Sequence, residues 1–447
     1  MRGCRLLIVL YDLLFLLLFL GLLPMWLAAL LLRPNLRSAV LARLRSPGLG
    51  PPLDRSVWLH GSSAGEVDLL RPLVATIERE HPGVPIVVSA FAISGYAAAL
   101  KAFSRHRVVF LPPEFSPLIR RALKRFRPRL LLLVESELWP NLILSAAGRG
   151  VPVCLLNAKM SEKSYRLHRR LGLVSPALCK LTLVAAQTDE HAARFRGLGV
   201  PDSAIHVTGN MKYDLASADD PAALRTALRH RYRIDDATAV IIGGSLHAGE
   251  DAALAWAAGS LAADGHRFRL VIVPRYPAEA ERMRAALANC GIDSVRKSAL
   301  DDGSARLPAD AALVVDSMGE LKQFYAMSDI AFVGGSLLYR GSNKGGHNLM
   351  EPGILGVAVL FGPHNFSFKE TVHDLLEDSA GIMVRDREEL YRALGSLLAE
   401  PGSARALGDR ARQLILARRG ATDRNHALIA GSIDQPFARR ERLRRSA

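Results

Sequence analysis

The sequence is poor in the residue types on which several common protein classes depend. Its 447 residues include four scattered cysteines, with no C-x-x-C pair, so neither a disulfide framework nor a structural zinc site is expected. Aromatic residues make up only 6% of the chain, and no basic strand carries the interleaved aromatics of a nucleic-acid surface. The cysteines are Cys4, Cys154, Cys179 and Cys290.

Acidic residues are also in the minority. The chain has 58 Lys and Arg against 43 Asp and Glu, which gives a formal net charge of +15 with histidine neutral. Such an excess suits an anionic membrane surface, an acidic substrate or nucleic acid. Apolar residues make up 49% of the chain, so global disorder is excluded. At roughly 150 residues per domain, the length corresponds to two or three domains.

The first apolar run is long enough to cross a membrane. Residues 6–32 contain one charged residue, Asp12, and at about 1.5 Å per helical residue they could span the hydrocarbon core. A cleaved signal peptide usually has a shorter run that ends at small residues, whereas this run ends in Leu-Leu-Leu-Arg-Pro. We predict an uncleaved anchor over 1–33, and the arginines after it indicate a cytoplasmic body. Asp12 and Pro24 would also suit a helix that lies in one leaflet.

Short apolar runs alternate with helical stretches through the rest of the chain. Each run has the length of a strand that is buried in a parallel sheet, and the stretches between them suit crossover helices. This pattern predicts an α/β fold with two doubly wound halves. The runs are 56–61, 86–91, 108–112, 130–136, 153–158 and 182–187, then 239–245, 269–275, 312–317, 330–336 and 358–363.

A polar stretch between the two sets of runs indicates a connection between domains. We predict an N-terminal Rossmann-like domain over 34–215, a linker over 216–237, a second such domain over 238–420 and a basic tail over 421–447. Ligands of doubly wound sheets bind beyond the carboxyl ends of the strands. The residues that follow each run are therefore the candidate site residues.

An acid follows the first run. Glu66 opens a helix directly after the strand, where the helix N-terminus favours the ionised form that a general base needs. An ordinary first-turn acid is the alternative. The neighbouring His60, Ser62 and Ser63 favour a functional role.

Two more acids follow the fourth run. Glu135 and Glu137 stand next to Trp139, at the end of an otherwise apolar strand. Strand alternation sends both acids to the same side, which is unusual for a strand buried on both faces. We interpret the pair as part of a site, with helix capping as the alternative.

A glycine-rich segment in the second half offers a place for an anion. Residues 332–353 run from a strand through a loop into a helix, and the backbone N–H groups of Gly345, Gly346 and His347 could bind a nucleotide phosphate. The segment matches neither the P-loop nor the dinucleotide fingerprint. Glu351, in the first helical turn, could accept hydrogen bonds from ribose hydroxyls.

Two shorter pieces extend this candidate anion site. Arg275, at a strand end, could hold a phosphate or a carboxylate, and the backbone near Gly319 could approach a base. No D-x-D pair occurs in the chain, so the carboxylate pair that usually bridges a metal to a sugar nucleotide is missing. We expect no metal, with side chains and helix dipoles neutralising the phosphate.

A series of motifs, in order along residues 5–430, resembles the 3-deoxy-D-manno-octulosonic acid (Kdo) transferases, membrane-anchored glycosyltransferases of lipid A assembly. The resemblance implies a GT-B fold and a metal-independent, inverting transfer of Kdo from CMP-Kdo to the lipid A precursor, lipid IVA. It implies an inner-membrane protein with its catalytic domains on the cytoplasmic face, and no cofactor beyond the donor. The most specific motifs are ESELWPNL (135–142), GNMKYD (209–214) and GGHN (345–348).

The resemblance also implies roles for individual residues. Glu66 matches the base that takes the proton from the acceptor hydroxyl, and Glu135 and Lys212 match positions that stabilise the transition state. The first domain would bind the acceptor and the second CMP-Kdo. The residues that match CMP contacts are Pro274, Arg275, Met318, Gly319, Glu320, Asn348, Leu349, Met350 and Glu351.

Two other interpretations stay open. A GT-B transferase that uses a different nucleotide sugar on a membrane lipid would share the glycine-rich loop and Glu351. A catalytically silent member of the family would also fit, because segments 88–96 and 340–344 depart from the family pattern.

Two basic segments, 116–129 and 159–170, carry many of the Lys and Arg residues. A solvated helix face is the simplest interpretation. We expect instead that they contact anionic headgroups and the phosphates of the acceptor, at about 1 kcal/mol per basic residue near the surface. The expected partners are therefore CMP-Kdo, the lipid A precursor and an anionic membrane surface, without nucleic acid.

Overall fold

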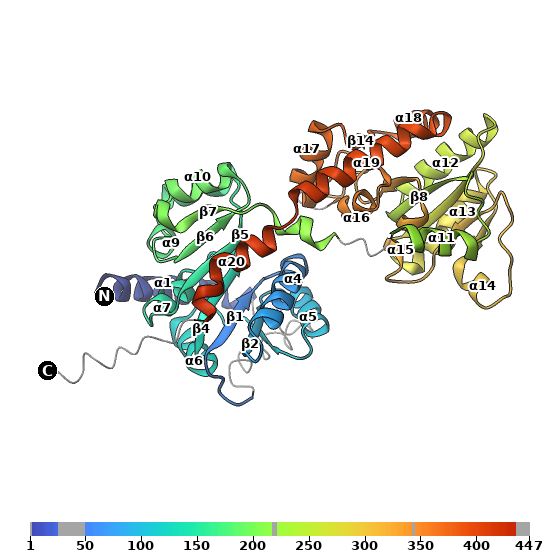
Figure 1. The fold of residues 1–447 in the computed structure, drawn as a ribbon. Coiled ribbons are helices and arrows are strands. Elements are labelled where there is room, and N and C mark those ends of the chain that lie inside the picture. Colours follow the sequence, from blue (N-terminus) through green and yellow to red (C-terminus); the bar gives the residue numbers. More distant parts are fainter. Residues whose placement is uncertain (1, 26–49, 217–220, 342–344, 435–447) are drawn as a thin grey trace. The chain divides into compact units, whose positions relative to one another are not determined.

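The chain folds into two α/β units (Figure 1). A computed structural model describes residues 2–25, 50–216, 221–341 and 345–434. The units divide after Leu215 and again after Arg418, so the C-terminal residues return to the first unit.

The first unit contains a seven-stranded parallel sheet of order β3-β2-β1-β4-β5-β6-β7. The strands are β1 (Ser56–His60), β2 (Ile86–Ala90), β3 (Arg107–Phe110), β4 (Pro128–Val134), β5 (Val153–Ala158), β6 (Leu183–Ala186) and β7 (Ile205–Val207). The helices are α1 (Arg2–Gly21), α4 (Ala64–Glu80), α5 (Ile93–Ala102), α6 (Ser116–Phe126), α7 (Pro140–Ala147), α8 (Glu162–Leu171), α9 (Ser175–Leu178), α10 (Asp189–Gly197) and α20 (Ala421–Asp434), with 3₁₀ turns η2 (Asp202–Ala204) and η3 (Met211–Leu215).

The second unit contains another seven-stranded parallel sheet, of order β10-β11-β9-β8-β12-β13-β14. The strands are β8 (Ala239–Leu246), β9 (Phe268–Pro274), β10 (Ser294–Arg296), β11 (Ala312–Val314), β12 (Ile330–Val333), β13 (Ala358–Phe361) and β14 (Ile382–Met383). The helices are α11 (Pro221–Arg231), α12 (Glu250–Ala263), α13 (Ala280–Ala288), α14 (Lys297–Asp301), α15 (Leu321–Met327), α16 (Met350–Ile354), α17 (Lys369–Glu377), α18 (Arg387–Ala399) and α19 (Pro401–Arg418), with 3₁₀ turns η4 (Pro277–Glu279) and η5 (Phe366–Phe368).

Helices cover both faces of the first sheet. Val57 and Leu59 of β1 join one apolar core with residues of α4 and α20, whereas Trp58 between them joins the opposite core with residues of α6 and α7. Strands with two buried faces need apolar residues at nearly every position. This requirement explains why short apolar runs predicted the inner strands.

Every run that the sequence analysis assigned to the two sheets forms a strand. Strands β7, β10 and β14 were not predicted. Each is three residues long or shorter and lies at the edge of its sheet. An edge strand of this length is too short to show a pattern in the sequence.

Helix α1 contacts the rest of the first unit through its acidic residue. Asp12 accepts hydrogen bonds from the N (2.8 Å) and Oγ (2.6 Å) of Ser116 and from Nδ2 of Asn141 (3.0 Å). In the described part of the chain, no helix combines the length and the apolar character needed to cross a bilayer. Residues 26–32 of the predicted anchor lie outside the described residues, so the anchor stays a prediction.

The structure corrects the predicted linker over 216–237. Residues 221–231 form α11, which packs against α15 in the second unit. Arg229 on this helix is buried, and its Nη2 lies 2.7 Å from Oδ2 of Asp329. Residues 217–220 lie outside the described residues.

The structure also corrects the predicted basic tail over 421–447. Its first part forms α20, which lies beside α4 (Figure 1) and contributes Ile429 and Ile433 to the core of the first unit. Both carboxylate oxygens of Asp214 accept from the start of this helix, at 2.6 Å from the N of Gly420 and 2.6 Å from the N of Thr422. Residues 435–447 lie outside the described residues.

We expect the Asp214→Ala variant to loosen α20. The change leaves two N–H groups at the helix N-terminus without their acceptor, which costs about 1–2 kcal/mol. Amide hydrogen exchange over 421–434 should then be about 5- to 30-fold faster than in the wild type. Asp409→Ala, at an exposed position of α19, is the control and should leave that exchange unchanged. Equal exchange in both variants would contradict the capping role.

Candidate functional site

Each sheet has one place where the strand order reverses. It lies between β1 and β4 in the first unit and between β8 and β12 in the second. Helices leave such a pair of strands on opposite faces, and ligands of this fold class bind beyond the carboxyl ends there. Most of the predicted site residues follow one of these four strands or an immediate neighbour.

Glu66 lies in the first turn of α4, directly after β1. Its Oε2 accepts from the N of Ser62 (2.6 Å) and the N of Ser63 (3.0 Å), and Oγ of Ser63 accepts from the N of Glu66, which completes a capping box. Burial, together with the nearby Glu137 carboxylate, raises the pKa of Glu66 to about 7 in spite of these bonds. The carboxyl group can therefore gain or lose a proton near neutral pH.

Glu137 is held by three side chains around the same point. Its Oε2 accepts from Oγ of Ser62 (2.5 Å) and Nε1 of Trp139 (2.5 Å) and lies 3.2 Å from Nε2 of His60. Burial opposes ionisation of Glu137, but its contacts with His60, Ser62 and Trp139 outweigh burial and lower its pKa. The two acids thus have different protonation behaviour, with Glu137 ionised and Glu66 close to its titration point.

Glu135 faces a different set of partners. Strand β4 ends one residue earlier, and Glu135 has a φ of 58°, so the strand alternation stops there. Its Oε2 lies 2.6 Å from Nζ of Lys159, and its Oε1 lies 3.5 Å from Nζ of Lys212. Strand alternation therefore does not decide how Glu135 and Glu137 are oriented, and the two acids have different partners. The structure does bring the predicted pair Glu135 and Lys212 together.

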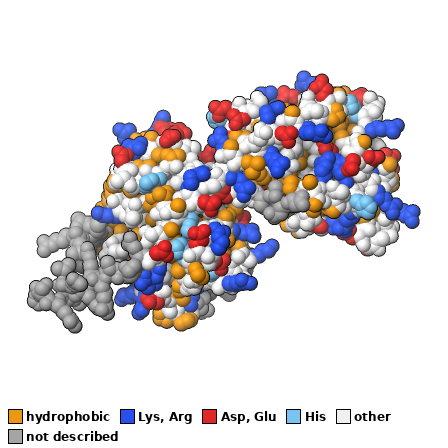
Figure 2. Space-filling model, in the orientation of Figure 1, with side chains coloured by type: hydrophobic (Ala, Val, Ile, Leu, Met, Phe, Trp, Pro, Cys, Tyr) orange, Lys and Arg blue, Asp and Glu red, His pale blue; other side chains and the backbone are white. Residues whose placement is uncertain are grey.

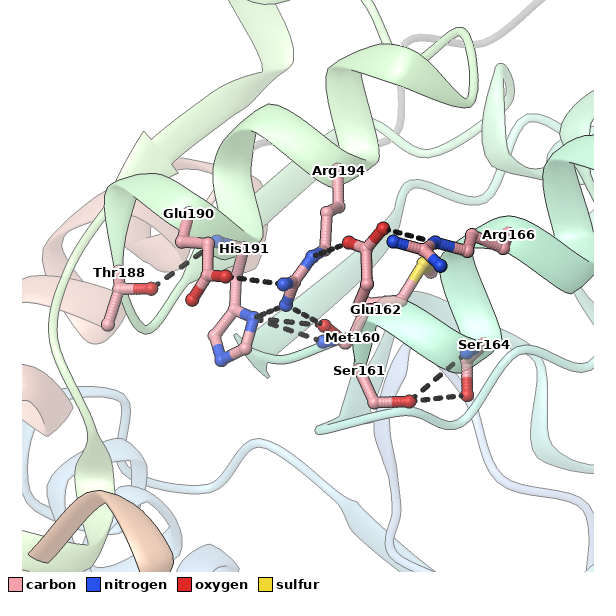
Figure 3. A network of polar contacts seen from close by, with 9 residues as sticks. All are labelled: Met160, Ser161, Glu162, Ser164, Arg166, Thr188, Glu190, His191 and Arg194. Carbon is pink, nitrogen blue, oxygen red and sulfur yellow. Dashed lines mark hydrogen bonds and ion pairs between the residues drawn. The ribbon is translucent and has the colours of Figure 1, made fainter. Parts of the chain in front are cut away.

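Lys159 was not predicted as a site residue, although it stands in a basic segment. Its N donates to the carbonyl oxygen of Glu135 at 3.2 Å. The network in Figure 3 fixes the turn that follows, because Arg194 of α10 donates to the carbonyl oxygen of Met160 (2.6 Å) and to Oε2 of Glu162 (3.2 Å). Only the pairing of β4 with β5 could have revealed that this lysine meets Glu135.

In the second unit the predicted residues follow three strands, β11, β9 and β12, and β8 lies between β9 and β12 in the sheet. Pro274 ends β9, and the N of Arg275 donates to the carbonyl oxygen of Leu246 at the end of β8 (2.9 Å). The guanidinium carbon of Arg275 lies 5.5 Å from the ring centroid of Tyr276. The arginine is thus positioned at the carboxyl edge of the sheet.

The turn after β11 contains Met318, Gly319 and Glu320. Met318 is 66% exposed, and Gly319 has a φ of 86°, which favours glycine. Glu320 already has partners, because Oγ of Ser317 donates to it and Nζ of Lys297 lies 3.3 Å away. Met318 and the backbone of Gly319 are therefore the better candidates for a direct ligand contact.

The segment from Asn348 to Glu351 leads into the short helix α16. Nδ2 of Asn348 donates to Oε1 of Glu351 (3.2 Å), and burial raises the pKa of Glu351. The side chains of Leu349 and Met350 are buried, so these two could reach a ligand only through their backbone. The N of Gly346 donates to the carbonyl oxygen of Gly335 (2.5 Å), so the predicted anion site has one backbone donor fewer than expected.

Glu250, at the start of α12, organises the strand ends around this site. Its carboxylate is fully buried and accepts from the N of Gly335 (2.7 Å), Ser336 (2.8 Å), Leu337 (2.9 Å) and His247 (3.1 Å). It therefore joins the segment after β8 to the segment after β12. Glu250 was not predicted as a site residue. The signal that could have found it is the one that identified Glu66, an acid in the first turn of a helix that follows a strand.

Potential metal ligands gather at another place. Within the described ranges, three such groups come within reach of one ion only at His373, Asp374 and Glu377 of α17. They have partners already, since Nδ1 of His373 lies 3.4 Å from Oε2 of Glu377 and Oδ1 of Asp374 lies 3.1 Å from Nη2 of Arg418. None of them is a predicted site residue.

Known sequences resemble most of the chain. A family profile described as 3-deoxy-D-manno-octulosonic-acid transferase (kdotransferase) matches residues 37–215. A Bordetella pertussis protein named 3-deoxy-D-manno-octulosonic acid transferase is 35% identical over 387 residues, which cover 83% of this chain and 86% of that protein. A Haemophilus influenzae protein of the same name is 31% identical over 379 residues, with the same coverages of 83% and 86%.

Solved structures share the architecture. A UDP-GlcNAc 2-epimerase from Neisseria meningitidis has a TM-score of 0.55 and 13% identity, covering 85% of this chain and 99% of its own. A glycosyltransferase from Rickettsia africae has a TM-score of 0.53 and 12% identity, with coverages of 85% and 98%. At such identities the likeness concerns the fold alone. It confirms the predicted pair of Rossmann-like domains of the GT-B type.

We expect the Glu66→Gln variant to be more heat-stable than the wild type above pH 7, with a gain that shrinks toward about pH 5. The folded-state pKa of about 7 lies above the ordinary value of 4.5, so the wild-type carboxyl stabilises the fold while it keeps its proton. That contribution is lost as the pH rises from about 4.5 to about 7, whereas glutamine keeps the capping box and stays neutral. Thermal unfolding across this pH range measures the difference.

A matched amide substitution controls for the general effect of pH. Asp409→Asn, at an exposed position of α19, should differ from the wild type by the same small amount at every pH. A stability difference for Glu66→Gln that does not vary with pH would contradict the raised pKa of Glu66.

Proposed function

Because the chain belongs to the family of 3-deoxy-D-manno-octulosonic acid transferases, which are glycosyltransferases, we propose that it transfers Kdo from CMP-Kdo to the lipid A precursor with inversion at the anomeric carbon. The names of the Bordetella and Haemophilus relatives support the sugar that is transferred. The donor nucleotide, the lipid IVA acceptor and the inversion rest on the resemblance of the motifs. The observation that carries the mechanism is Glu66, a half-buried acid at the point where the first sheet reverses, with a pKa of about 7.

Glu66 acts as the general base in this proposal. Its ionised carboxylate takes the proton of an acceptor hydroxyl while the hydroxyl oxygen forms a bond to the anomeric carbon of Kdo. The bond from that carbon to the phosphate oxygen breaks, and its electron pair leaves with CMP. Glu137 keeps Glu66 basic, because a second negative charge nearby favours proton uptake.

Glu135, Lys159 and Lys212 supply fixed charge beside the base. The single carboxylate contacts two ammonium groups, so the cluster carries an excess of one positive charge. Such a charge stabilises negative charge that develops as the glycosidic bond breaks. Glu135 orients both lysines, which is the role that we propose for this acid.

The second unit binds the donor in this proposal. Arg275 and the backbone of Pro274 would contact the nucleotide, Met318 and Gly319 would lie against its base, and Glu351 would accept from ribose hydroxyls. The partial burial of Glu351 and its hydrogen bond with Asn348 support an acceptor held in place in this segment. We propose no metal, since arginine and backbone donors provide the positive potential.

We propose that the protein works at the cytoplasmic face of the inner membrane. Helix α1 exposes many apolar side chains, of which Leu13 is 53% and Leu17 is 69% exposed. Basic side chains of α6 and α8 would add attraction to anionic headgroups. On the face shown in Figure 2, Lys and Arg side chains are interspersed with Asp and Glu, so the net charge of +15 is not gathered into one patch there.

We expect Glu66→Gln to lower Kdo transfer by at least about 100-fold, because general base catalysis contributes that much or more. In the wild type, kcat/KM should rise with pH and level off above about pH 7, as Glu66 loses its proton. The assay contains the full chain, CMP-Kdo and tetraacylated lipid A precursor, and mass spectrometry detects the added sugar. Glu78→Gln, at an exposed position of the same helix, should leave the rate unchanged.

The same assay separates the alternatives. No added Kdo in the wild type, when a known transferase works in parallel, would contradict the proposed reaction. Replacement of CMP-Kdo by UDP-sugars tests for a different donor. A folded wild type that converts none of these donors would indicate a catalytically silent protein.

We expect two kinds of variant to weaken membrane binding differently. Leu13→Glu with Leu17→Glu should reduce flotation with neutral and anionic vesicles alike, because each removes apolar contact. Arg121→Glu with Lys124→Glu should reduce flotation with anionic vesicles only. Leu13→Met with Leu17→Met is the matched control and should float as the wild type does. Equal flotation of all four proteins would contradict the proposed membrane contact.

A further inference from the structure

Two histidines face each other where the second sheet reverses. His247 follows β8, and His347 precedes α16 in the segment after β12. Their Nε2 atoms lie 3.0 Å apart, and the rings are nearly parallel, with centroids 5.2 Å apart and an interplanar angle of 9°. At this distance only one Nε2 can carry the hydrogen that joins them. The pair therefore shares one N–H···N bond.

Positive charge surrounds the pair. Burial, followed by the charges of His247, Arg275 and Arg340, lowers the pKa of His347 to about 4. Burial and Arg340 also lower the pKa of His247, while Glu250 and Glu279 oppose this effect. Both acids are engaged elsewhere, Glu250 with backbone N–H groups and Glu279 with Arg282 at 3.7 Å.

The two arginines have no acidic partner among the residues that the structure describes. Arg275 follows β9 and Arg340 lies in the segment after β12, and the charges of both lower the pKa of each histidine. The ring of Tyr276 meets His247 edge-on, with centroids 6.2 Å apart. Four groups able to carry positive charge thus act on one another, and Glu250 and Glu279 offset this charge only in part. A bound anion would supply it.

We propose that His247 and His347, together with Arg275 and Arg340, form an anion clamp for the phosphate of the nucleotide and that the histidine pair takes up a proton when this phosphate binds. The proposal rests on the proposed function, because the nucleotide is the CMP of the donor. It adds two residues for which the sequence predicted no side-chain role.

The physical reason for proton uptake is a change in the sign of the local potential. Without a ligand, the two guanidinium groups repel a proton on either ring, and burial adds to this cost. A phosphate between them cancels much of that potential and can accept a hydrogen bond from a protonated ring. The phosphate of CMP-Kdo is a diester with one negative charge, whereas that of released CMP carries close to two at neutral pH. The clamp therefore binds the leaving group more strongly than the donor, which favours bond cleavage.

Isothermal titration of CMP into the full-length protein tests the clamp. Titrations at about pH 7.5 in two buffers with different ionisation enthalpies give the number of protons taken up. We expect about one proton per CMP in the wild type and no uptake with cytidine, which lacks the phosphate. His347→Gln and His247→Gln should each abolish the uptake and weaken CMP binding by about tenfold or more. His373→Gln, at an exposed histidine of the same unit, is the control and should match the wild type.

A second measurement avoids substitutions in a buried site. Imidazole ¹⁵N resonances of the wild type should report two neutral rings without ligand and an added proton on the pair with CMP. CMP binding without proton uptake, or uptake that persists in both glutamine variants, would overturn the clamp alone. A folded wild type that binds no CMP would overturn the proposed donor and the clamp with it, so the two failures are distinguishable.

Discussion

The reversal of strand order within each parallel sheet is the constraint on which the candidate sites depend. The first sheet reverses between β1 and β4 and the second between β8 and β12. The chain must leave these neighbouring strands toward opposite faces, so no helix covers the carboxyl ends between them. Residues far apart in the sequence therefore meet there, as His60 does with Glu137 and His247 with His347. In both units an acid in the first turn of the helix after the first of these strands, Glu66 or Glu250, accepts backbone N–H groups.

The two first-turn acids show how partners decide the role of a carboxylate. Glu250 accepts four backbone N–H groups and is fully buried, so it is suited to join two chain segments. Glu66 accepts two such groups, but it also lies near the ionised Glu137, and its pKa is raised to about 7. Four backbone donors thus suit Glu250 to a structural role, whereas Glu66, with two donors and a negative neighbour, suits the proton transfer that we propose for it.

Much of the fold could be predicted because the signals were local. Inner strands buried on both faces required continuous apolar runs, and Glu66 was recognisable as an acid at a strand-to-helix junction. The tail was mistaken because α20 depends on Asp214, which is about 200 residues away in the sequence. The different partners of Glu135 and Glu137 could not be predicted from strand alternation, because the strand ends before Glu135, which has a left-handed φ. The partners of Lys159 and His247 could not be predicted, because in each case the partner follows another strand of the sheet. Lys159 follows β5 and meets Glu135 after β4, and His247 follows β8 and meets His347 after β12.

Each reversal point holds one titratable group whose pKa is shifted toward the uncharged form, an acid in the first unit and a base in the second. Burial raises the pKa of the acid Glu66 and lowers the pKa of the base His347, so each group carries less charge at neutral pH than it would in water. In the proposed reaction the acceptor hydroxyl gives its proton to Glu66, and the leaving phosphate draws a proton onto the histidine pair. As the bond between Kdo and CMP breaks, Glu66 would then lose its negative charge and the histidine pair would gain a positive one, which stabilises the transition state more than the ground state.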